Sequence, residues 1–203
     1  MLRYCLAPIG LALCTLTIPA MAAPAPSAEA VVTALHTSLI DAMTRSAKLG
    51  CEGRLKLLQP RVDQTFDLPF VAERTLRRHW KSLDNSQQQA FTAALQRSFS
   101  TTYATEFSSP GSIEFVTGKS EMLGNGDALV HTSLTPKGRS AITLDYVLKP
   151  YGGEWRVVNV LADGVSDLAL RSTQYDGLMK NQGFDALMAR LEQQTQALKA
   201  RCS

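Results

Sequence analysis

Residues 142–161, ITLDYVLKPYGGEWRVVNVL, contain the pattern that decides the fold class. Positions alternate in character on either side of Gly152 and Gly153, which is typical of β-strands with one buried face. The two glycines favour a tight turn between the strands. The positions predicted to share the buried face are Ile142, Leu144, Tyr146 and Leu148, then Trp155, Val157, Asn159 and Leu161. The segment therefore predicts an antiparallel hairpin.

Two further alternating runs precede this hairpin, one at 113–115 and one at 128–134. Clusters of Gly, Asn, Asp and Pro separate the runs and indicate turns. Polar Thr143, Asp145 and Lys149 oppose the apolar positions of the third run, so one face of the sheet should meet helices and the other should be at least partly wet. We expect an antiparallel meander of four strands.

In the rest of the chain, apolar residues recur three and four positions apart, which predicts helices. Before the strands we expect helices at 28–48, 52–66 with a kink or break at Pro60, 67–81 and 86–107. After them we expect two helices separated by Gly183, one ending near Asn181 and one near Arg201. Because helices and strands are segregated along the chain, the sequence predicts an α+β fold, with an antiparallel four- to five-stranded sheet packed against flanking helices.

Composition limits the classes of function. The chain has 203 residues, 45% of them hydrophobic and 19% charged, which is enough apolar material for a packed core and too mixed for disorder. Its net charge of +3 is far below the concentrated basic charge that binding to nucleic acid usually needs. We therefore expect a globular protein with no nucleic-acid partner.

The first 22 residues resemble a Sec-type signal peptide. Arg3 supplies a cationic start, 5–18 is a nearly uncharged apolar run, and Ala20-Met21-Ala22 is a small-x-small cleavage pattern. The run is too short to span a bilayer comfortably. We expect an exported, periplasmic chain that begins near Ala23 and forms a single domain over 23–203.

Two cysteines, Cys51 and Cys202, remain after the signal peptide. In an oxidising compartment these two could pair in a disulfide, or both could stay as thiols.

The groups that catalysis and cofactor binding require are not assembled in motifs. His36, His79 and His131 fall on three different predicted elements without metal-binding spacing, so we expect no metal and no cofactor. Asp163 and Glu106 are the carboxylates that acid-base chemistry could use, but an Asx-turn is the simpler role for Asp163. A nucleophile at Ser166 is less favoured than a helix cap.

The predicted helix at 67–81 carries a row of cations at positions i, i+3, i+4 and i+7, which would share one face. This row is either an ordinary solvated helix face or a surface that attracts a phosphate headgroup or an anionic membrane. Its members are Arg74, Arg77, Arg78 and Lys81.

Two blocks of sequence resemble the MlaC-type periplasmic lipid carriers, also called the toluene-tolerance or ABC-transporter auxiliary family. The first block is FDLPF at 66–70 with QQQAF at 87–91, and the second is GEWRVVNV at 153–160 with DGVS at 163–166. The stretch LGCEGR at 49–54 looks more like the hopanoid-associated HpnM group within this family. Asn159 departs from the acidic residue that the family pattern would place there.

The resemblance implies a cone related in shape to the NTF2-like fold, holding lipid tails between sheet and helices. It implies phospholipid or hopanoid cargo and transient contact with inner- and outer-membrane lipid-transport proteins. We expect the protein to be a monomer. A chain of 16 carbons left in water costs on the order of 12 kcal/mol, so such a carrier needs a dry cavity. The candidate cavity walls are Phe91, Leu95, Phe99, Tyr103, Ile142, Leu144, Tyr146, Leu148, Trp155, Val157, Phe184 and Leu187.

We expect a lipid carrier that is not an enzyme, and two other functions are alternatives to it. An enzyme on the same fold would need convergent polar groups and a buried carboxylate in its cavity. An assembly factor would bind protein and no lipid.

Overall fold

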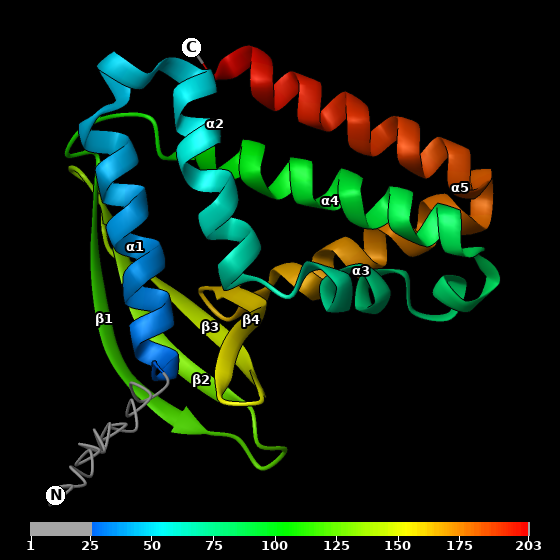
Figure 1. Cartoon of the computed structure of the whole chain (residues 1–203), viewed down its shortest axis with the longest axis horizontal. Helices are drawn as coiled ribbons and strands as arrows, with labels where there is room; N and C mark the ends of the chain where they lie inside the picture. Colours follow the sequence, from blue (N-terminus) through cyan, green and yellow to red (C-terminus); the bar gives the residue numbers. More distant parts are fainter. Residues whose placement is uncertain (1–25, 203) are drawn as a thin grey trace, which may run out of the picture.

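The computed structural model describes residues 26–202, and the predicted signal peptide at 1–22 lies outside them. The chain folds into helices, then a sheet, then a final bent helix (Figure 1), which confirms the predicted α+β class. The elements are α1 (Ala28–Thr44), α2 (Ser46–Thr65), α3 (Leu68–Leu76), the 3-10 helix η1 (Arg77–Ser82), α4 (Asn85–Glu106), β1 (Ile113–Met122), β2 (Ala128–Pro136), β3 (Ile142–Tyr151), β4 (Glu154–Ala162), β5 (Val165–Ser166) and α5 (Asp167–Arg201).

The sheet is an antiparallel meander in the order β1-β2-β3-β4-β5. The first four strands match the four alternating runs, and the two-residue β5 adds a short fifth strand beside β4. Figure 1 shows α1 lying across β1 and β2, while α4 and α5 extend away from the sheet. Helices therefore cover one side of the sheet.

The pairing of β3 with β4 contains a bulge. Leu148 pairs with Val157, whereas Val147 pairs with Asn159, so Val158 is an extra residue on β4. Both Val157 and Val158 are buried. An extra residue reverses the alternation of side chains along the rest of the strand.

This bulge overturns part of the predicted register. Simple alternation predicts that Asn159 and Leu161 share the inward face with the start of β4, but in the structure they do not. Val160 and Ala162 take those places instead, and Ala162 pairs directly with Leu144.

Two predicted helix boundaries are also wrong. The first helix ends at Thr44 instead of near 48, and Gly50, at φ 57°, is a non-helical position within α2. The helix predicted over 67–81 ends as an α-helix at Leu76, because Arg77 has φ 48° and the chain continues as η1. The break predicted at Gly183 is confirmed, since its φ of 81° divides α5 into two helical arms, whereas α2 continues through Pro60, where a kink or break was predicted.

The core lies between the sheet and the helices. His36 of α1 stacks on Phe115 of β1, with ring centroids 4.1 Å apart, and a hydrogen bond joins its Nε2 to the hydroxyl of Tyr146 on β3 at 3.0 Å. A disulfide between Cys51 and Cys202 fastens α2 to the end of α5. The disulfide that the sequence left open is therefore present.

Candidate functional site

An open hollow of about 290 Å³ lies where the start of α5 passes over α4 and the strand pair β3–β4. We call it the apolar hollow. Its volume is at the small end of the range for ligand pockets. The residues that line it are Phe99, Thr102, Tyr103, Leu144, Val160, Ala162, Val165, Asp167, Leu170 and Arg171.

Aromatic residues form the wall contributed by α4. Phe99 and Tyr103 lie one helical turn apart, and both rings contact Phe66, with centroid distances of 5.5 and 5.7 Å. Burial raises the pKa of Tyr103 well above its ordinary value, so its hydroxyl stays neutral. This wall is therefore uncharged and largely fixed by packing.

One ion pair closes the side of the hollow formed by α5. Nε of Arg171 donates to Oδ2 of Asp167 over 2.7 Å, and the guanidinium lies 4.8 Å from the centroid of the Phe99 ring. Burial alone would lower the pKa of Arg171, but the Asp167 carboxylate beside it raises that pKa above the ordinary value. Arg171 therefore stays charged, and its ion pair with Asp167 largely neutralises that charge at the wall of the hollow.

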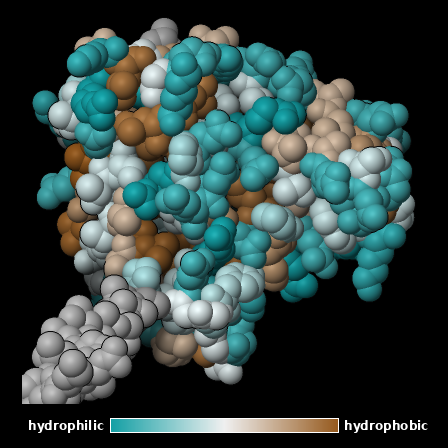
Figure 2. Space-filling view, in the orientation of Figure 1, coloured by the Kyte–Doolittle hydropathy of each residue, from teal (hydrophilic) through white to brown (hydrophobic). Residues whose placement is uncertain are grey.

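The rim of the hollow exposes hydrocarbon to solvent. Val165 is 53% exposed and Leu170 is 52% exposed, and both belong to the small set of large hydrophobic residues on the described surface. On the face drawn in Figure 2, hydrophobic residues form separate patches among hydrophilic ones. Apolar side chains around an apolar opening are typical of a site that receives an apolar ligand.

Three of the predicted wall residues line this hollow: Phe99, Tyr103 and Leu144. The other nine lie in the core or pack against it, and the structure does not bring them to the hollow. Their assignment to a cavity wall stays a prediction. These residues are Phe91, Leu95, Ile142, Tyr146, Leu148, Trp155, Val157, Phe184 and Leu187.

Several lining residues were not predicted. Val160 and Ala162 reach the hollow only because of the bulge at Val158, which no alternating pattern reveals. Leu170 and Arg171 reach it because the start of α5 packs against β4. The signal available in the sequence is the pair of adjacent valines, Val157 and Val158, where strict alternation fails.

The corner between β4 and α5 is held by side chains that were considered for catalysis. Oδ1 of Asp163 accepts a hydrogen bond from the backbone N–H of Thr143 at 2.9 Å, and Asp163 is exposed. Ser166 caps α5 by accepting from the Ala169 N–H, as predicted. Glu106 is exposed and lies 3.6 Å from Arg201. None of these three candidates lines the apolar hollow.

Asn159 supplies a neutral anchor at the same corner. Its Oδ1 accepts from Oγ of Ser166 at 3.0 Å and from the backbone N–H of Leu168 at 3.2 Å. The amide therefore fixes the first turn of α5, which carries one side of the hollow.

The four predicted cations meet at a second depression, which we call the basic hollow, although the helix that was expected to align them ends at Leu76. It has a volume of about 930 Å³ and lies between the α3–η1 segment and α5. Its lining residues are Glu73, Arg74, Arg77, Arg78, Lys81, Ser166, Leu168, Ala169 and Ser172.

Neither a metal site nor a membrane span is found in the part of the chain that the structure describes. Over 26–202, no three His, Cys, Asp or Glu side chains gather as a metal ion would require. Within the same range, every helix is too short or too polar to cross a bilayer.

A family model described as MlaC protein matches residues 33–193 of this sequence. The chain belongs to the MlaC family. Its fold is similar to that of a phospholipid-binding protein from Ralstonia solanacearum, solved in complex with a phospholipid, with a TM-score of 0.74 at 16% sequence identity. The match covers 85% of this chain and 99% of the other. The family resemblance read from the two sequence blocks is therefore confirmed.

Proposed function

We propose that this MlaC family protein is a periplasmic lipid carrier that shields the hydrocarbon tails of a phospholipid in the apolar hollow. The observation that carries the proposal is an apolar opening whose rim exposes Val165 and Leu170. The phospholipid bound by the Ralstonia relative supports the choice of cargo. A hopanoid, which the LGCEGR stretch at 49–54 suggests, is the second candidate cargo.

A long alkyl tail needs more room than the apolar hollow provides. A small void of about 10 Å³ lies next to the hollow and shares Phe99, Val160 and Asp167 with it. We infer that a tail widens the hollow toward this void. The free energy available is large, because each buried methylene contributes about 0.8 kcal/mol.

Binding and release require two states with different affinity for lipid. We infer that α5 up to Gly183 is the moving part, since its first turns cover the hollow and Gly183 interrupts the helix. Docking to inner- and outer-membrane lipid-transport proteins would shift the balance between the closed and open states. Carriage by a monomer is the simplest arrangement.

The carrier function is tested by Leu144→Arg, which places a cation on the wall beside Arg171. The matched control is Val116→Arg on β1, because Val116 is 54% exposed and does not line the hollow. Lipid is extracted from each purified protein and measured by mass spectrometry. We expect Leu144→Arg to lose most of its co-purified lipid and Val116→Arg to retain it, with native circular dichroism for both. Equal lipid content in the two variants would refute this site.

A further inference from the structure

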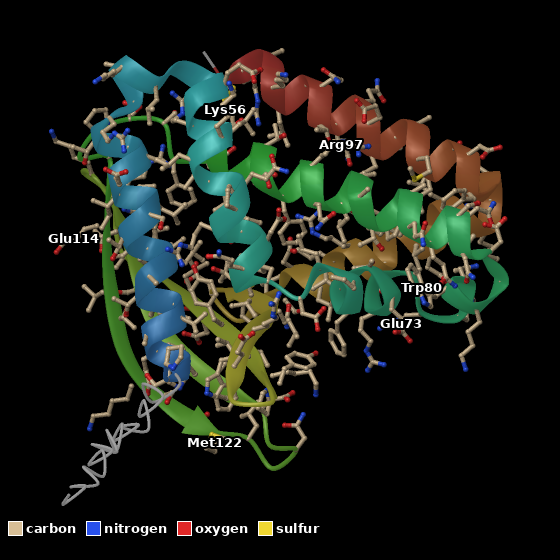
Figure 3. All side chains as sticks on the ribbon, viewed as in Figure 1. Lys56, Glu73, Trp80, Arg97, Glu114 and Met122 are labelled. Atoms are coloured by element: carbon tan, nitrogen blue, oxygen red, sulfur yellow. A yellow bond between two sulfur atoms is a disulfide. The ribbon has the colours of Figure 1, made fainter. Side chains whose placement is uncertain are left out.

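The α3–η1 segment presents a row of cations that the rest of the protein only partly neutralises. Arg74, Arg77, Arg78 and Lys81 are all exposed, and Glu73 is the single carboxylate among the described residues that line the basic hollow. Figure 3 labels Glu73 and Trp80, which mark this segment on the side of the molecule away from β1. These four cations outnumber Glu73 and Asp176, the carboxylate paired with Arg78, so the hollow attracts anions.

Two of the cations have internal partners and two do not. Arg78 lies 2.9 Å from Asp176 of α5, and the Arg74 guanidinium lies 5.6 Å from the centroid of the Phe70 ring. Within 26–202, neither Arg77 nor Lys81 makes a salt bridge. These two side chains are therefore available to an external anion.

A buried hydroxyl in the same hollow points to a ligand independently of the charges. Ser172 is 3% exposed, and its Oγ has no hydrogen-bond partner in the described part of the chain. A buried polar group without a partner destabilises the folded state. A phosphate oxygen in the hollow would accept a hydrogen bond from this hydroxyl.

The backbone at Arg77 is also unusual. Its φ of 48° is a conformation that side chains other than Gly, Asn and Asp seldom adopt. This conformation ends α3 and starts η1, so that the cations on both sides of the junction face one hollow.

We propose that the basic hollow docks the protein onto the surface of an anionic bilayer, with lipid phosphate groups between the α3–η1 cations and Ser172. This proposal extends the proposed carrier function by naming the surface on which cargo is exchanged. The hollow is open and about 930 Å³ in volume, which suits a surface of headgroups better than one small ion.

The position of the basic hollow relative to the apolar hollow supports a membrane as the partner. Both hollows share the start of α5 as a wall: Leu168, Ala169 and Ser172 line the basic one, while Leu170 and Arg171 line the apolar one. A helix is about 10 Å across, so docking through the cations brings the exposed rim of the apolar hollow close to the lipid surface.

The test is flotation with vesicles of phosphatidylcholine alone and of phosphatidylcholine mixed with phosphatidylglycerol. The variant is Arg77→Gly with Lys81→Gln, which removes the two unpaired cations. The control is Lys137→Gln with Arg139→Gln in the exposed β2–β3 turn, which changes the net charge equally and lies far from α3 (Figure 1). Lipid extraction from the same proteins reports the carrier function separately.

We expect the wild type and the control to bind the phosphatidylglycerol vesicles, to bind neutral vesicles weakly, and to dissociate as salt is raised. Each cation near an anionic surface contributes a factor of about 5, so the double variant should bind about 30-fold more weakly. Its co-purified lipid should be unchanged, because neither residue lines the apolar hollow.

Several outcomes would overturn the docking proposal. One is that the wild-type protein binds no vesicles, and another is that it binds neutral and anionic vesicles equally. A third is that the variant and the control lose vesicle binding to the same extent. Release by inorganic phosphate at constant ionic strength would show instead that the hollow holds a soluble anion. In each case the lipid content of the wild type still decides the carrier function.

Discussion

The side chain of Arg54 is 2% exposed, and its Nε donates a hydrogen bond to the backbone carbonyl oxygen of Ala104 over 2.9 Å. Ala104 lies in the last turn of α4, whose carbonyl groups have no partners inside the helix. Nη2 of the same guanidinium lies 3.4 Å from the carbonyl oxygen of Cys202, which follows α5. One buried cation thus joins α2 to the negative ends of two helices.

Replacing Arg54 with Met should therefore destabilise the protein. The substitution keeps most of the apolar stem but leaves the Ala104 carbonyl buried without a donor, and we expect a loss of about 2–3 kcal/mol in the free energy of unfolding. Arg97→Met is the control, because the Arg97 side chain is 56% exposed and makes a long ion pair with Glu192, at 3.8 Å. Urea unfolding of both variants checks this, and equal midpoints would contradict it.

The Cys51–Cys202 disulfide closes a loop with a sequence separation of 151. Removing a disulfide that closes so long a loop frees the unfolded chain, and the expected cost is about 2–5 kcal/mol. Thermal unfolding of Cys51→Ser/Cys202→Ser should show a clear fall in Tm. Adding a reductant should lower the Tm of the wild type and leave that of the variant unchanged, and any other pattern would contradict this role.

The free energy of unfolding should fall as the pH is lowered from about 6.5 to about 4, because of His36. Burial lowers the pKa of His36 to about 4, whereas the unfolded chain titrates near 6.5. In this window the unfolded state binds more protons than the folded state, so acid favours unfolding, by about 3 kcal/mol when the window is fully crossed.

Replacing His36 with Gln should remove most of this pH dependence, at some cost in stability at neutral pH, because Gln loses the stacking on Phe115. His131→Gln is the control, since His131 is about half exposed on the outer face of β2. Urea unfolding across the pH range checks both variants. A wild-type slope that persists in His36→Gln would rule out His36 as its source.

Arg77→Gly should stabilise the protein slightly. Glycine adopts a φ of 48° without steric cost, so the gain from relieved strain should outweigh the entropy of a more flexible unfolded chain by about 1 kcal/mol. Lys81→Gly in η1 is the control, and we expect it to be neutral or destabilising. A lower Tm for Arg77→Gly than for Lys81→Gly would contradict the assignment of strain.

Much of this fold could be predicted because local patterns and tertiary packing agree. Alternation located the four long strands, and Gly183 located the bend in α5. The end of α3 was missed because Leu76 and Arg77 are ordinary helix formers, and only tertiary packing places Arg77 at a positive φ. Helical spacing therefore grouped the right four cations. They share a hollow because α3 ends and η1 begins at Arg77, however, and not because they lie on one face of a continuous α-helix.

The site was less predictable than the fold. Phe99 and Tyr103 stand out as an aromatic stripe, but the sequence does not distinguish them from Phe91, which is fully buried. The bulge at Val158 decides which residues in the second half of β4 face the hollow. A bulge depends on pairing with β3, and the sequence of one strand does not encode that pairing. Cavity walls depend on packing between distant elements, whereas strands and helices leave a periodic signal.

The most direct test of the carrier function is the lipid content of the wild-type protein, purified from cells without detergent and extracted with organic solvent. Mass spectrometry should find phospholipid, or hopanoid if that is the cargo, in a fixed molar ratio to the protein. Native protein that carries no lipid, and takes none up from vesicles, would contradict the carrier function.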